Sequence, residues 1–573
     1  MLYVNDDDDY YYLFAGSSIR STANTNTNTN TNTTKRNTQR KLEQGGFFIH
    51  GFHKYATKML LSSFLLLSIP AAVSSLSSHY KNNNNKNNNT VHGEGNASPA
   101  VFVTKFLPDN FQVAQDLAKM ELTKYDMYSG FFTIDAATDS NTYFVFSKAL
   151  NGDIEAPVLL WLQGGPGASS LFGLFTEIGP FNIGKEMKIE PRAQSWNQDH
   201  HMLFLDNPLG TGFSFTSELG RMATNQTTIG QDLYAALSQF FEMFPDLRSN
   251  DFFVTGESYA GKYVPSCAFE IHNQNQRVVD QENKINLKGI AIGDGAFDPA
   301  GQFYNFGDLL FYIGMADEVE REQFNVYEKE WKQKMEANDY VGAFRVFDEM
   351  LNGDFYPYPT YYANRTGMGS NYFNFNQGPD GSSLTENYFI DWLGTTAGRE
   401  LMHVGEIPYN VFNQTVESQL VGDWMLGVVD KLTVLLEHYR VLIYNGQYDI
   451  ILGPPLTEQA LRNIPWSGQE QYLETPKKIW RIPFSSSPTE RTTTRQTTEN
   501  NMLRLGTSIV DATAASPDAL YDTAFDVAGY YRTVGDFTQL VVRGAGHMVP
   551  GDQPFRALDM IKRFVRGESF GDN

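Results

Sequence analysis

From residue 126 onward, short apolar runs recur along the chain, and most of them end at a glycine-rich or polar turn. The runs at 128–134 and 143–146 flank a polar turn and predict a β-hairpin. Further short runs predict buried strands at 158–162, 202–205, 252–254, 290–292, 441–444 and 539–542. Because helical patterns lie between several of these runs, the sequence predicts an α/β fold with a central, mostly parallel sheet flanked by helices.

The strand pattern stops between residues 303 and 430. This segment holds a charge-rich helical stretch at 318–338 and a piece rich in Tyr, Asn and Gly at 356–376. We interpret 303–430 as a lid inserted over the carboxyl edge of the sheet, within a catalytic core formed by 101–302 and 431–570. A Thr- and Ser-rich stretch without large apolar residues, 485–501, predicts a disordered surface loop.

The N-terminal hundred residues follow a different pattern. Residues 1–58 contain an acidic run and an Asn-Thr repeat, which predict a disordered extension. Lys54 and Lys58 precede an apolar run and then small residues, so 59–77 predicts a secretory signal peptide; the run is shorter than the ~20 residues of a membrane helix. Translation from Met59 and an uncleaved signal anchor both remain open, and a membrane is expected only with the anchor. Residues 78–100 form an Asn-rich linker or propeptide-like segment.

Composition limits which molecules the protein can bind and which cell compartment it can occupy. Among 573 residues, 66 Asp and Glu exceed 44 Lys and Arg, for a net charge of −22, which argues against nucleic acid as a partner. The one cysteine, Cys267, permits no intramolecular disulfide and is expected to be buried. Few cysteines usually suggest the cytosol, but the signal pattern favours the secretory pathway. Beyond the signal, five N-x-S/T triplets are then glycosylation candidates, at Asn88, Asn96, Asn225, Asn364 and Asn413.

The stretch around Ser258 predicts a nucleophile. A predicted strand runs into Gly256-Glu257-Ser258-Tyr259-Ala260, and a helical pattern follows. This is the nucleophile elbow, G-x-S-x-G/A, whose small residues permit a tight turn that lifts the serine hydroxyl clear of the sheet. The helix that follows favours negative charge at its N-terminus.

A catalytic serine needs a base, and the base needs an orienting carboxylate, in the chain order Ser, acid, His for this elbow. Asp449 follows the strand predicted at 441–444, and His547 follows the strand at 539–542 after Gly544-Ala545-Gly546. Each could instead be structural: Asp449 a loop cap, His547 a core histidine. Their order and glycine context favour the catalytic interpretation.

A glycine-rich loop, Gln163-Gly164-Gly165-Pro166-Gly167, follows the strand at 158–162. Such a loop can offer backbone N–H groups to an oxyanion, although it could also be an ordinary glycine turn. We predict that Gly165 and Tyr259 donate to the oxyanion.

Together these segments resemble the serine carboxypeptidase family, that of carboxypeptidase Y and lysosomal cathepsin A, over about 106–565. Within it the chain looks most like the vitellogenic-like carboxypeptidases. The matching stretches are Trp161-Leu-Gln-Gly-Gly-Pro-Gly-Ala-Ser-Ser170, Asp206-Asn-Pro-Leu-Gly-Thr-Gly-Phe-Ser214, Gly256-Glu-Ser-Tyr-Ala-Gly-Lys-Tyr-Val-Pro265 and Gly546-His-Met-Val-Pro-Gly-Asp-Gln-Pro554.

The resemblance implies an α/β-hydrolase exopeptidase with an acidic optimum, acting on peptides or proteins with a free C-terminus. It implies that Gln163, Gly164 and Glu257 hold the substrate carboxylate, with Glu177 beside Glu257. Two carboxyls that share a proton can donate to that carboxylate only while one stays protonated.

Three positions depart from the family pattern. Gln163 stands where the family usually has Asn, so the longer side chain either still reaches the carboxylate or alters preference. Ala168 stands where many members have a cysteine, which removes a family disulfide. Leu452 stands where some members have a thiol, and this predicts weak sensitivity to thiol reagents.

The leading hypothesis is therefore a carboxypeptidase of the secretory pathway, either lysosomal, vacuolar or extracellular. It requires no cofactor or metal, and the sequence lacks metal-ligand spacing such as H-E-x-x-H. An acyltransferase or esterase on the same scaffold and a protective scaffold protein of a lysosomal complex are the alternatives. A homodimer is compatible with the sequence.

Overall fold

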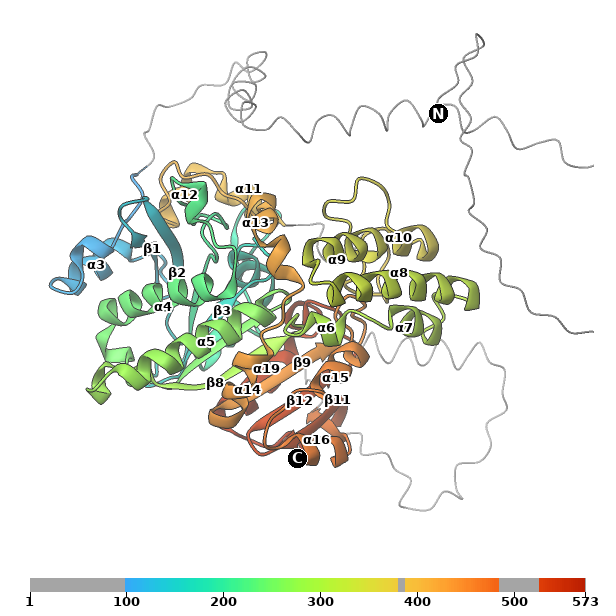
Figure 1. The fold of residues 1–573 in the computed structure, drawn as a ribbon. Helices are drawn as coiled ribbons and strands as arrows, with labels where there is room; N and C mark the ends of the chain where they lie inside the picture. The colour runs from blue at the N-terminus through green and yellow to red at the C-terminus, as the bar shows by residue number, and fades with distance from the viewer. Residues whose placement is uncertain (1–97, 380–386, 484–524, 572–573) are drawn as a thin grey trace, which may run out of the picture. The chain divides into compact units, whose positions relative to one another are not determined.

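A computed structural model describes residues 98–379, 387–483 and 525–571 (Figure 1). They are built on a ten-stranded mixed sheet in the order β1-β2-β6-β3-β7-β8-β9-β12-β11-β10. Strands β4 and β5 form a separate two-stranded hairpin. The strands are β1 (Met127–Asp135), β2 (Ser140–Ser147), β3 (Val158–Leu162), β4 (Phe181–Ile183), β5 (Ile189–Pro191), β6 (His201–Leu205), β7 (Phe252–Glu257), β8 (Leu287–Gly293), β9 (Arg440–Gly446), β10 (Lys478–Pro483), β11 (Phe525–Val534) and β12 (Phe537–Val542).

The middle of the sheet is parallel and both margins are antiparallel. β6, β3, β7, β8, β9 and β12 pair in parallel, so their carboxyl ends meet at one edge of the sheet. β1 and β2 extend one side, and β11 and β10 extend the other. Loops that follow parallel strands converge at such an edge, which is where ligands bind in open α/β sheets.

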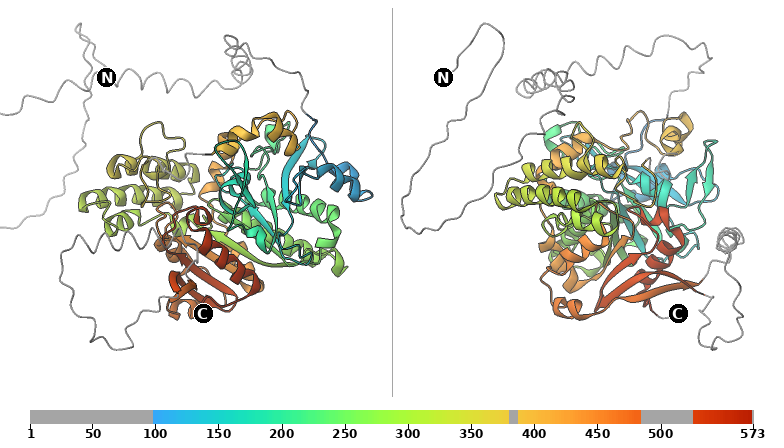
Figure 2. Two further views of the ribbon diagram at one scale, coloured as in Figure 1. Left: turned by 180° about the vertical axis from the view of Figure 1, so that it is seen from behind. Right: turned by 90° about the vertical axis from the view of Figure 1, so that its right-hand side faces the viewer.

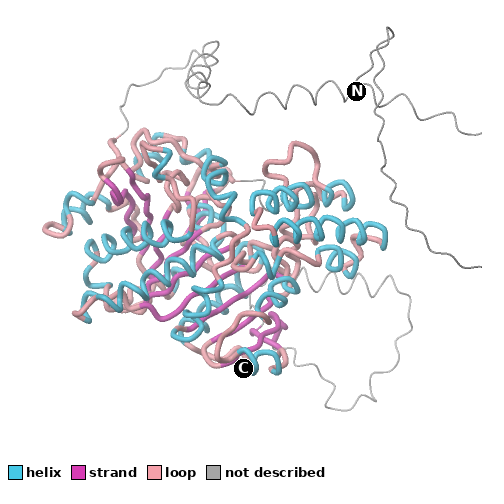
Figure 3. Tube along the Cα trace, viewed as in Figure 1, coloured by secondary structure: helices cyan, strands magenta, loops and turns pink. Residues whose placement is uncertain are grey.

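Helices cover both faces of the sheet, as the views in Figures 2 and 3 show. They are α3 (Phe111–Ala118), α4 (Gln226–Met243), α5 (Ala260–Arg277), α6 (Pro299–Gln302), α7 (Phe306–Tyr312), α8 (Glu318–Glu336), α9 (Tyr340–Phe347), α10 (Tyr361–Thr366), α11 (Tyr388–Leu393), α12 (Thr396–Leu401), α13 (Gln414–Trp424), α14 (Val429–His438), α15 (Pro454–Leu461), α16 (Gln469–Glu474), α18 (Val549–Asp552) and α19 (Pro554–Arg566).

The central strands are buried on both faces, and alternate residues belong to two different cores. On β3, Leu160 belongs to the apolar cluster that contains side chains of α4, α5 and α14, whereas Trp161 belongs to the cluster that contains those of α11 and α19. All five residues of this strand are fully buried, which explains its continuous apolar sequence. The two apolar layers fix the strand register, because a slip of one residue would exchange every side chain between them.

The α/β-hydrolase fold predicted from the sequence is confirmed. All six predicted buried strands are present, as β3, β6, β7, β8, β9 and β12, and the N-terminal hairpin is β1–β2. β3 has the predicted bounds, and the other strands are longer than predicted. The helix predicted at 318–338 is α8, whose N-terminus carries a capping box between Asp317 and Glu320. Cys267 is fully buried in α5, as predicted, and burial raises the pKa of its thiol.

The segment predicted as a lid is divided between two places. α7 packs on α8, α8 packs on α9, and α9 packs on α13. α11 packs instead on β4, with the ring of Phe389 stacked 5.2 Å from that of Phe175. Figure 1 shows the two groups on different sides of the sheet. The extent of this lid as a unit stays a prediction.

Several predictions lie outside the described residues. They are the disordered extension 1–58, the signal at 59–77, nearly all of the linker 78–100 and the loop 485–501. Asn88 and Asn96 lie outside them too. Within the described ranges, we find no helix with the length and apolar character needed to span a membrane.

Candidate active site

The Ser258 turn is held in a conformation that few non-glycine residues adopt. It joins β7 to α5 with a φ of +66° at Ser258. The Ser258 N–H donates to the carbonyl of Gly293 at 3.0 Å, and its carbonyl accepts from the N–H of Ala296 at 3.0 Å. Gly293 ends the neighbouring strand β8 and Ala296 follows it, so the sheet itself fixes the turn. Ser258 is half-buried, whereas its two neighbours are fully buried.

The glycine loop after β3 packs directly on this turn. A Cβ added at Gly164 would lie 2.5 Å from the N of Tyr259 and 2.7 Å from Cβ of Ser258, so no larger residue fits. Gly165 has a φ of +104°, which also favours glycine. Among the hydrogen bonds of the described residues, none takes up the N–H of Gly165 or of Tyr259. Both predicted oxyanion donors are therefore free to donate.

Asp449 and His547 are joined across adjacent loops. His547 Nδ1 donates to Asp449 Oδ2 at 2.9 Å, and both side chains are buried. His547 Nε2 has no hydrogen-bond partner among the described residues, including Ser258. The three predicted catalytic residues thus lie at one edge of the sheet, after β7, β9 and β12, and the acid–histidine bond is already formed.

The inserted segment supports this pair. The backbone N–H of His547 donates to the carbonyl of Phe373 at 2.7 Å, and the two rings lie 4.8 Å apart. Asp552 accepts from the N–H of Gly546 at 2.7 Å and from the Asn374 amide at 2.8 Å. The loop that carries His547 is consequently fixed from both sides.

The two predicted carboxylate-binding glutamates are both buried. Glu177 lies on a π-helical turn (Gly173–Ile178). The guanidinium of Arg192 donates to the carbonyls of Phe175 and Thr176 in this turn and of Gly179 after it. Burial raises the pKa of Glu177 to about 7, although the charge of Arg192 acts in the opposite direction. Burial and the neighbouring Glu177 raise the pKa of Glu257 well above its usual range. The pair therefore holds a proton through the acidic pH range.

Gln163 connects this carboxyl pair to the strand before it. Its Nε2 donates to Glu257 Oε1 at 2.9 Å, and its Oε1 accepts from Trp161 Nε1 at 2.9 Å. Because the indole N–H of Trp161 can only donate, the Gln163 side chain must turn its oxygen toward Trp161 and its N–H₂ group toward Glu257. Of the four residues predicted to hold the substrate carboxylate, Gln163 is bonded to Glu257 and Gly164 packs on the Ser258 turn. The carboxyl oxygens of Glu177 have no hydrogen-bond partner among the described residues, but Glu177 is near enough to raise the pKa of Glu257.

A second carboxyl lies beside the Asp449–His547 pair. Among the described residues, Asp294, Asp449 and His547 form the one group of ligand-type side chains close enough to hold a metal ion, with atoms within 4.8 Å of one another. The His547 Nδ1 to Asp449 bond and a bond from the Gly446 N–H to Asp294 already engage them. The three side chains are therefore part of a hydrogen-bonded network. That the enzyme needs no metal stays a prediction.

A scan against protein-family models matches residues 118–567 to the model described as serine carboxypeptidase. That match covers more than half of the chain and both strands that carry the elbow and the histidine.

The chain belongs to the serine carboxypeptidase family.

Named relatives agree with this assignment. The chain is 40% identical over 450 residues to a venom serine carboxypeptidase of Apis mellifera, covering 78% of this chain and 86% of that protein. It is 40% identical over 443 residues to the probable serine carboxypeptidase CPVL of Homo sapiens, covering 77% and 84%. It is 36% identical over 477 residues to the vitellogenic carboxypeptidase of Aedes aegypti, covering 82% and 91%. The predicted family resemblance is confirmed.

A solved carboxypeptidase has the same fold. The structure of Kex1, described as a prohormone-processing carboxypeptidase from Saccharomyces cerevisiae, matches with a TM-score of 0.61 at 19% identity. The match covers 77% of this chain and 92% of that one.

Some residues of this serine carboxypeptidase site were not predicted from its sequence. Asp294 follows a predicted strand directly, the same signal that pointed to Asp449, but no partner was evident. Asp552 lies in the stretch after His547 without an assigned role. Lys262 and Asp423 form a buried ion pair of 2.6 Å beneath Tyr259, between residues 161 positions apart, and no local pattern indicates it.

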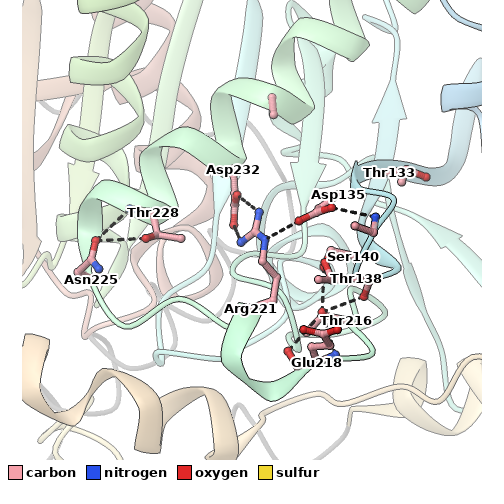
Figure 4. A network of polar contacts seen from close by, with 12 residues as sticks. Thr133, Asp135, Thr138, Ser140, Thr216, Glu218, Arg221, Asn225, Thr228 and Asp232 are labelled. Carbon is pink, nitrogen blue, oxygen red and sulfur yellow. Dashed lines mark hydrogen bonds and ion pairs between the residues drawn. The ribbon is translucent and has the colours of Figure 1, made fainter.

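Three glycosylation candidates fall on described residues of this serine carboxypeptidase. Asn225 is exposed at the start of α4, where its side chain accepts from the N–H of Thr228 (Figure 4). Asn364 is also exposed. Asn413 is half-buried, and its amide donates to the carbonyl of Gly210 at 2.7 Å. Attachment at Asn413 would have to break that bond in a half-buried position. The Asn364 amide donates to the carbonyl of Pro359 at 2.9 Å, but this residue and Asn225 are exposed.

Proposed function

We propose that this serine carboxypeptidase releases C-terminal residues from peptides and proteins through an acyl-enzyme on Ser258. The observation that carries the proposal is the 2.9 Å bond between His547 and Asp449, which leaves His547 Nε2 without a partner at the same sheet edge as Ser258. A base oriented by a buried carboxylate is what an unactivated serine hydroxyl requires.

The acylation step follows from these roles. Ser258 Oγ attacks the carbonyl carbon of the last peptide bond while His547 Nε2 takes the hydroxyl proton. Asp449 accepts from Nδ1–H and stabilises the charged imidazole. The tetrahedral oxyanion accepts from the N–H groups of Gly165 and Tyr259. His547 then gives its proton to the leaving nitrogen, and the C-terminal residue departs as the free amino acid.

Deacylation repeats these steps with water. His547 takes a proton from the water, whose oxygen attacks the ester carbonyl, and then returns the proton to Ser258 Oγ. The shortened peptide leaves with a new free carboxylate, and the enzyme is restored for the next residue.

Recognition of the substrate's free carboxylate is assigned to Gln163, Gly164, Glu257 and Glu177. The buried carboxyl pair supports this role, because one shared proton can be donated to an incoming carboxylate whereas two ionised carboxyls would repel it. The raised pKa values of the pair make this binding favourable at acidic pH. Acidic activity is therefore part of the proposal.

An acyltransferase or esterase on the same scaffold is the second candidate, since amines or alcohols can also intercept an acyl-enzyme. The buried carboxyl pair favours peptides with a free C-terminus. A scaffold protein within a lysosomal complex would not require the acid–histidine bond, so the geometry argues against that role.

We also assign the protein to the secretory pathway, lysosomal, vacuolar or extracellular. Relatives with the printed names venom and vitellogenic carboxypeptidase support this compartment. The exposed Asn225 and Asn364 are suitable acceptors for glycans there.

Trapping the acyl-enzyme tests the proposal. The protein, expressed in a secretory host, is mixed with an excess of a peptide ester, quenched with acid, and digested for mass spectrometry. We expect the acyl mass on the peptide that contains Ser258, and none in Ser258→Ala. Adding an amino acid amide separates the candidates: predominant hydrolysis supports the peptidase, and predominant transfer to the amide supports the acyltransferase. An acyl group on another residue would contradict both.

A further inference from the structure

Asp294 is anchored to the strand that leads to Asp449. It is the first residue after β8 and is fully buried. Its Oδ1 accepts the N–H of Gly446 at 2.9 Å, and its own N–H donates to the carbonyl of Tyr444 at 2.8 Å. Its φ is +42°, in a region that Asp tolerates better than most residues. The main chain and the side chain together hold this carboxyl at the end of β9.

The second carboxyl oxygen of Asp294, Oδ2, accepts no hydrogen bond from an N–H or O–H group of the described residues. This oxygen is buried. The carboxyl belongs to the group with Asp449 and His547 whose atoms lie within 4.8 Å of one another. Two carboxylates this close in a buried site cannot both be ionised at low cost, so one of them carries a proton.

The proton belongs on Asp294. Asp449 accepts from His547 Nδ1 and, at 3.3 Å, from the N–H of Leu452, and both bonds stabilise its ionised form. Asp294 has the N–H of Gly446 alone. Burial, the charge of Asp449 and a hydrogen bond with it raise the pKa of Asp294 well above its usual range.

The other titratable groups facing Asp294 do not reverse this preference. Glu257, at the end of β7, raises the pKa of Asp294 further. Tyr444 on β9 is fully buried, and burial with nearby carboxylates raises its pKa well above its usual range. His547 faces the group from the loop after β12, and its Nδ1 bond is directed at Asp449.

We propose that Asp294 is a positioning residue that stays protonated and donates a hydrogen bond to Asp449, so that Asp449 presents its charge to His547. This inference rests on the proposed function, in which Asp449 orients the base. Loss of the Asp294 proton places a second negative charge in the group. Asp449 then loses its donor and is repelled by the ionised Asp294, so it no longer holds the His547 ring in position for Ser258. Ser258 reactivity should therefore decline on the alkaline side.

Labelling with a fluorophosphonate tests this idea apart from substrate binding, because the probe has no C-terminal carboxylate and does not need Glu177 or Glu257. The labelling rate of the full glycosylated chain is measured from acidic to alkaline pH. Asp294→Asn has the same shape and a permanently neutral donor. We expect it to label at the wild-type rate at acidic pH and to keep that rate further into the alkaline range.

Two further variants sharpen the comparison. Asp294→Leu leaves the Gly446 N–H unsatisfied and should lower labelling roughly tenfold at every pH. Asp298→Asn changes a half-buried carboxyl outside the group and should leave the profile unchanged. If Asp294→Leu does not fold, the isosteric Asn variant, with its melting temperature as a check, decides alone.

The inference would be overturned if the labelling rate of Asp294→Asn declined at alkaline pH in the same way as that of wild type. It would also be overturned if Asp294→Asn were labelled as slowly as Asp294→Leu. Ser258→Ala keeps the two ideas apart. If Ser258→Ala were labelled at the wild-type rate, the proposed nucleophile would be contradicted. If Ser258→Ala were not labelled and the pH profile of Asp294→Asn labelling matched that of wild type, only the role of Asp294 would be contradicted.

Discussion

The amide of Gln163 joins the carboxyl of Glu257 through a hydrogen bond of 2.9 Å. Because Trp161 donates to the other end of the same amide, Gln163 can present only its N–H₂ group to Glu257. This bond favours an ionised oxygen on that side of Glu257. The shared proton is then left between Glu257 and Glu177, beside the Ser258 turn.

The pH dependence of peptide cleavage should follow this carboxyl pair. The proton is present below the raised pKa of Glu177, about 7, and is lost as the pH rises through it. KM for a peptide with a free C-terminus should therefore rise toward alkaline pH. Glu177→Gln keeps a neutral donor at every pH and should move the alkaline limit of kcat/KM upward. A blocked ester is the control substrate, and an unchanged limit in Glu177→Gln would argue against carboxylate recognition by the pair.

Stability should also depend on pH through Glu177. Its folded pKa, about 7, lies above its ordinary value of 4.5, so the unfolded chain releases this proton first. Stability is therefore greatest at acidic pH and falls between these two values, by about 3 kcal/mol from this group. Melting temperatures of wild type and Glu177→Gln, followed from acidic to neutral pH, measure the effect. A fall equally steep in both proteins would show that Glu177 does not contribute.

The buried Lys262–Asp423 pair should matter for both stability and catalysis. Asp423 on α13 lies 2.6 Å from Lys262 Nζ and accepts from the Tyr259 hydroxyl at 2.8 Å. Asp423→Ala leaves a buried charge unpaired and should lower the free energy of unfolding by about 3–5 kcal/mol. It should also lower kcat, since the N–H of Tyr259 is one of the two proposed oxyanion donors.

Urea unfolding at mildly acidic pH measures the stability change. The double variant Lys262→Met with Asp423→Leu removes both charges and serves as the matched control, which should recover most of the lost stability. A loss of less than about 1 kcal/mol in Asp423→Ala, typical of an exposed pair, would contradict the assignment of a buried one.

Local patterns made the elbow and its strand predictable. The sequence around Ser258 contains strand, turn and helix signals within about a dozen residues. Burial on both faces makes β3 and the first half of β7, Phe252 to Val254, continuously apolar. The margin of the sheet formed by β11 and β10 was missed for the converse reason. In β10 only Trp480 and Ile482 are buried, so its polar alternation resembles a loop. The short hairpin of β4 and β5 gave no distinct signal.

Long-range polar pairing could not be predicted from the residues. Glu177 and Glu257 each look like a surface charge, and only the family resemblance placed them together. Asp294 and Asp423 acquire their environments from strands and helices far away in sequence. The contact of Phe373 with His547 likewise depends on how the insertion folds over the loops.

The most direct test of the account is a time course of peptide shortening at mildly acidic pH, followed by mass spectrometry. One peptide has a free C-terminus, a second has the same sequence with a C-terminal amide, and each is incubated with wild type and with Ser258→Ala. The account predicts stepwise loss of single C-terminal residues from the free peptide by wild type, with little or none from the amide and none with Ser258→Ala. Intact free peptide after incubation with folded, glycosylated wild type, or equal shortening by Ser258→Ala, would contradict it.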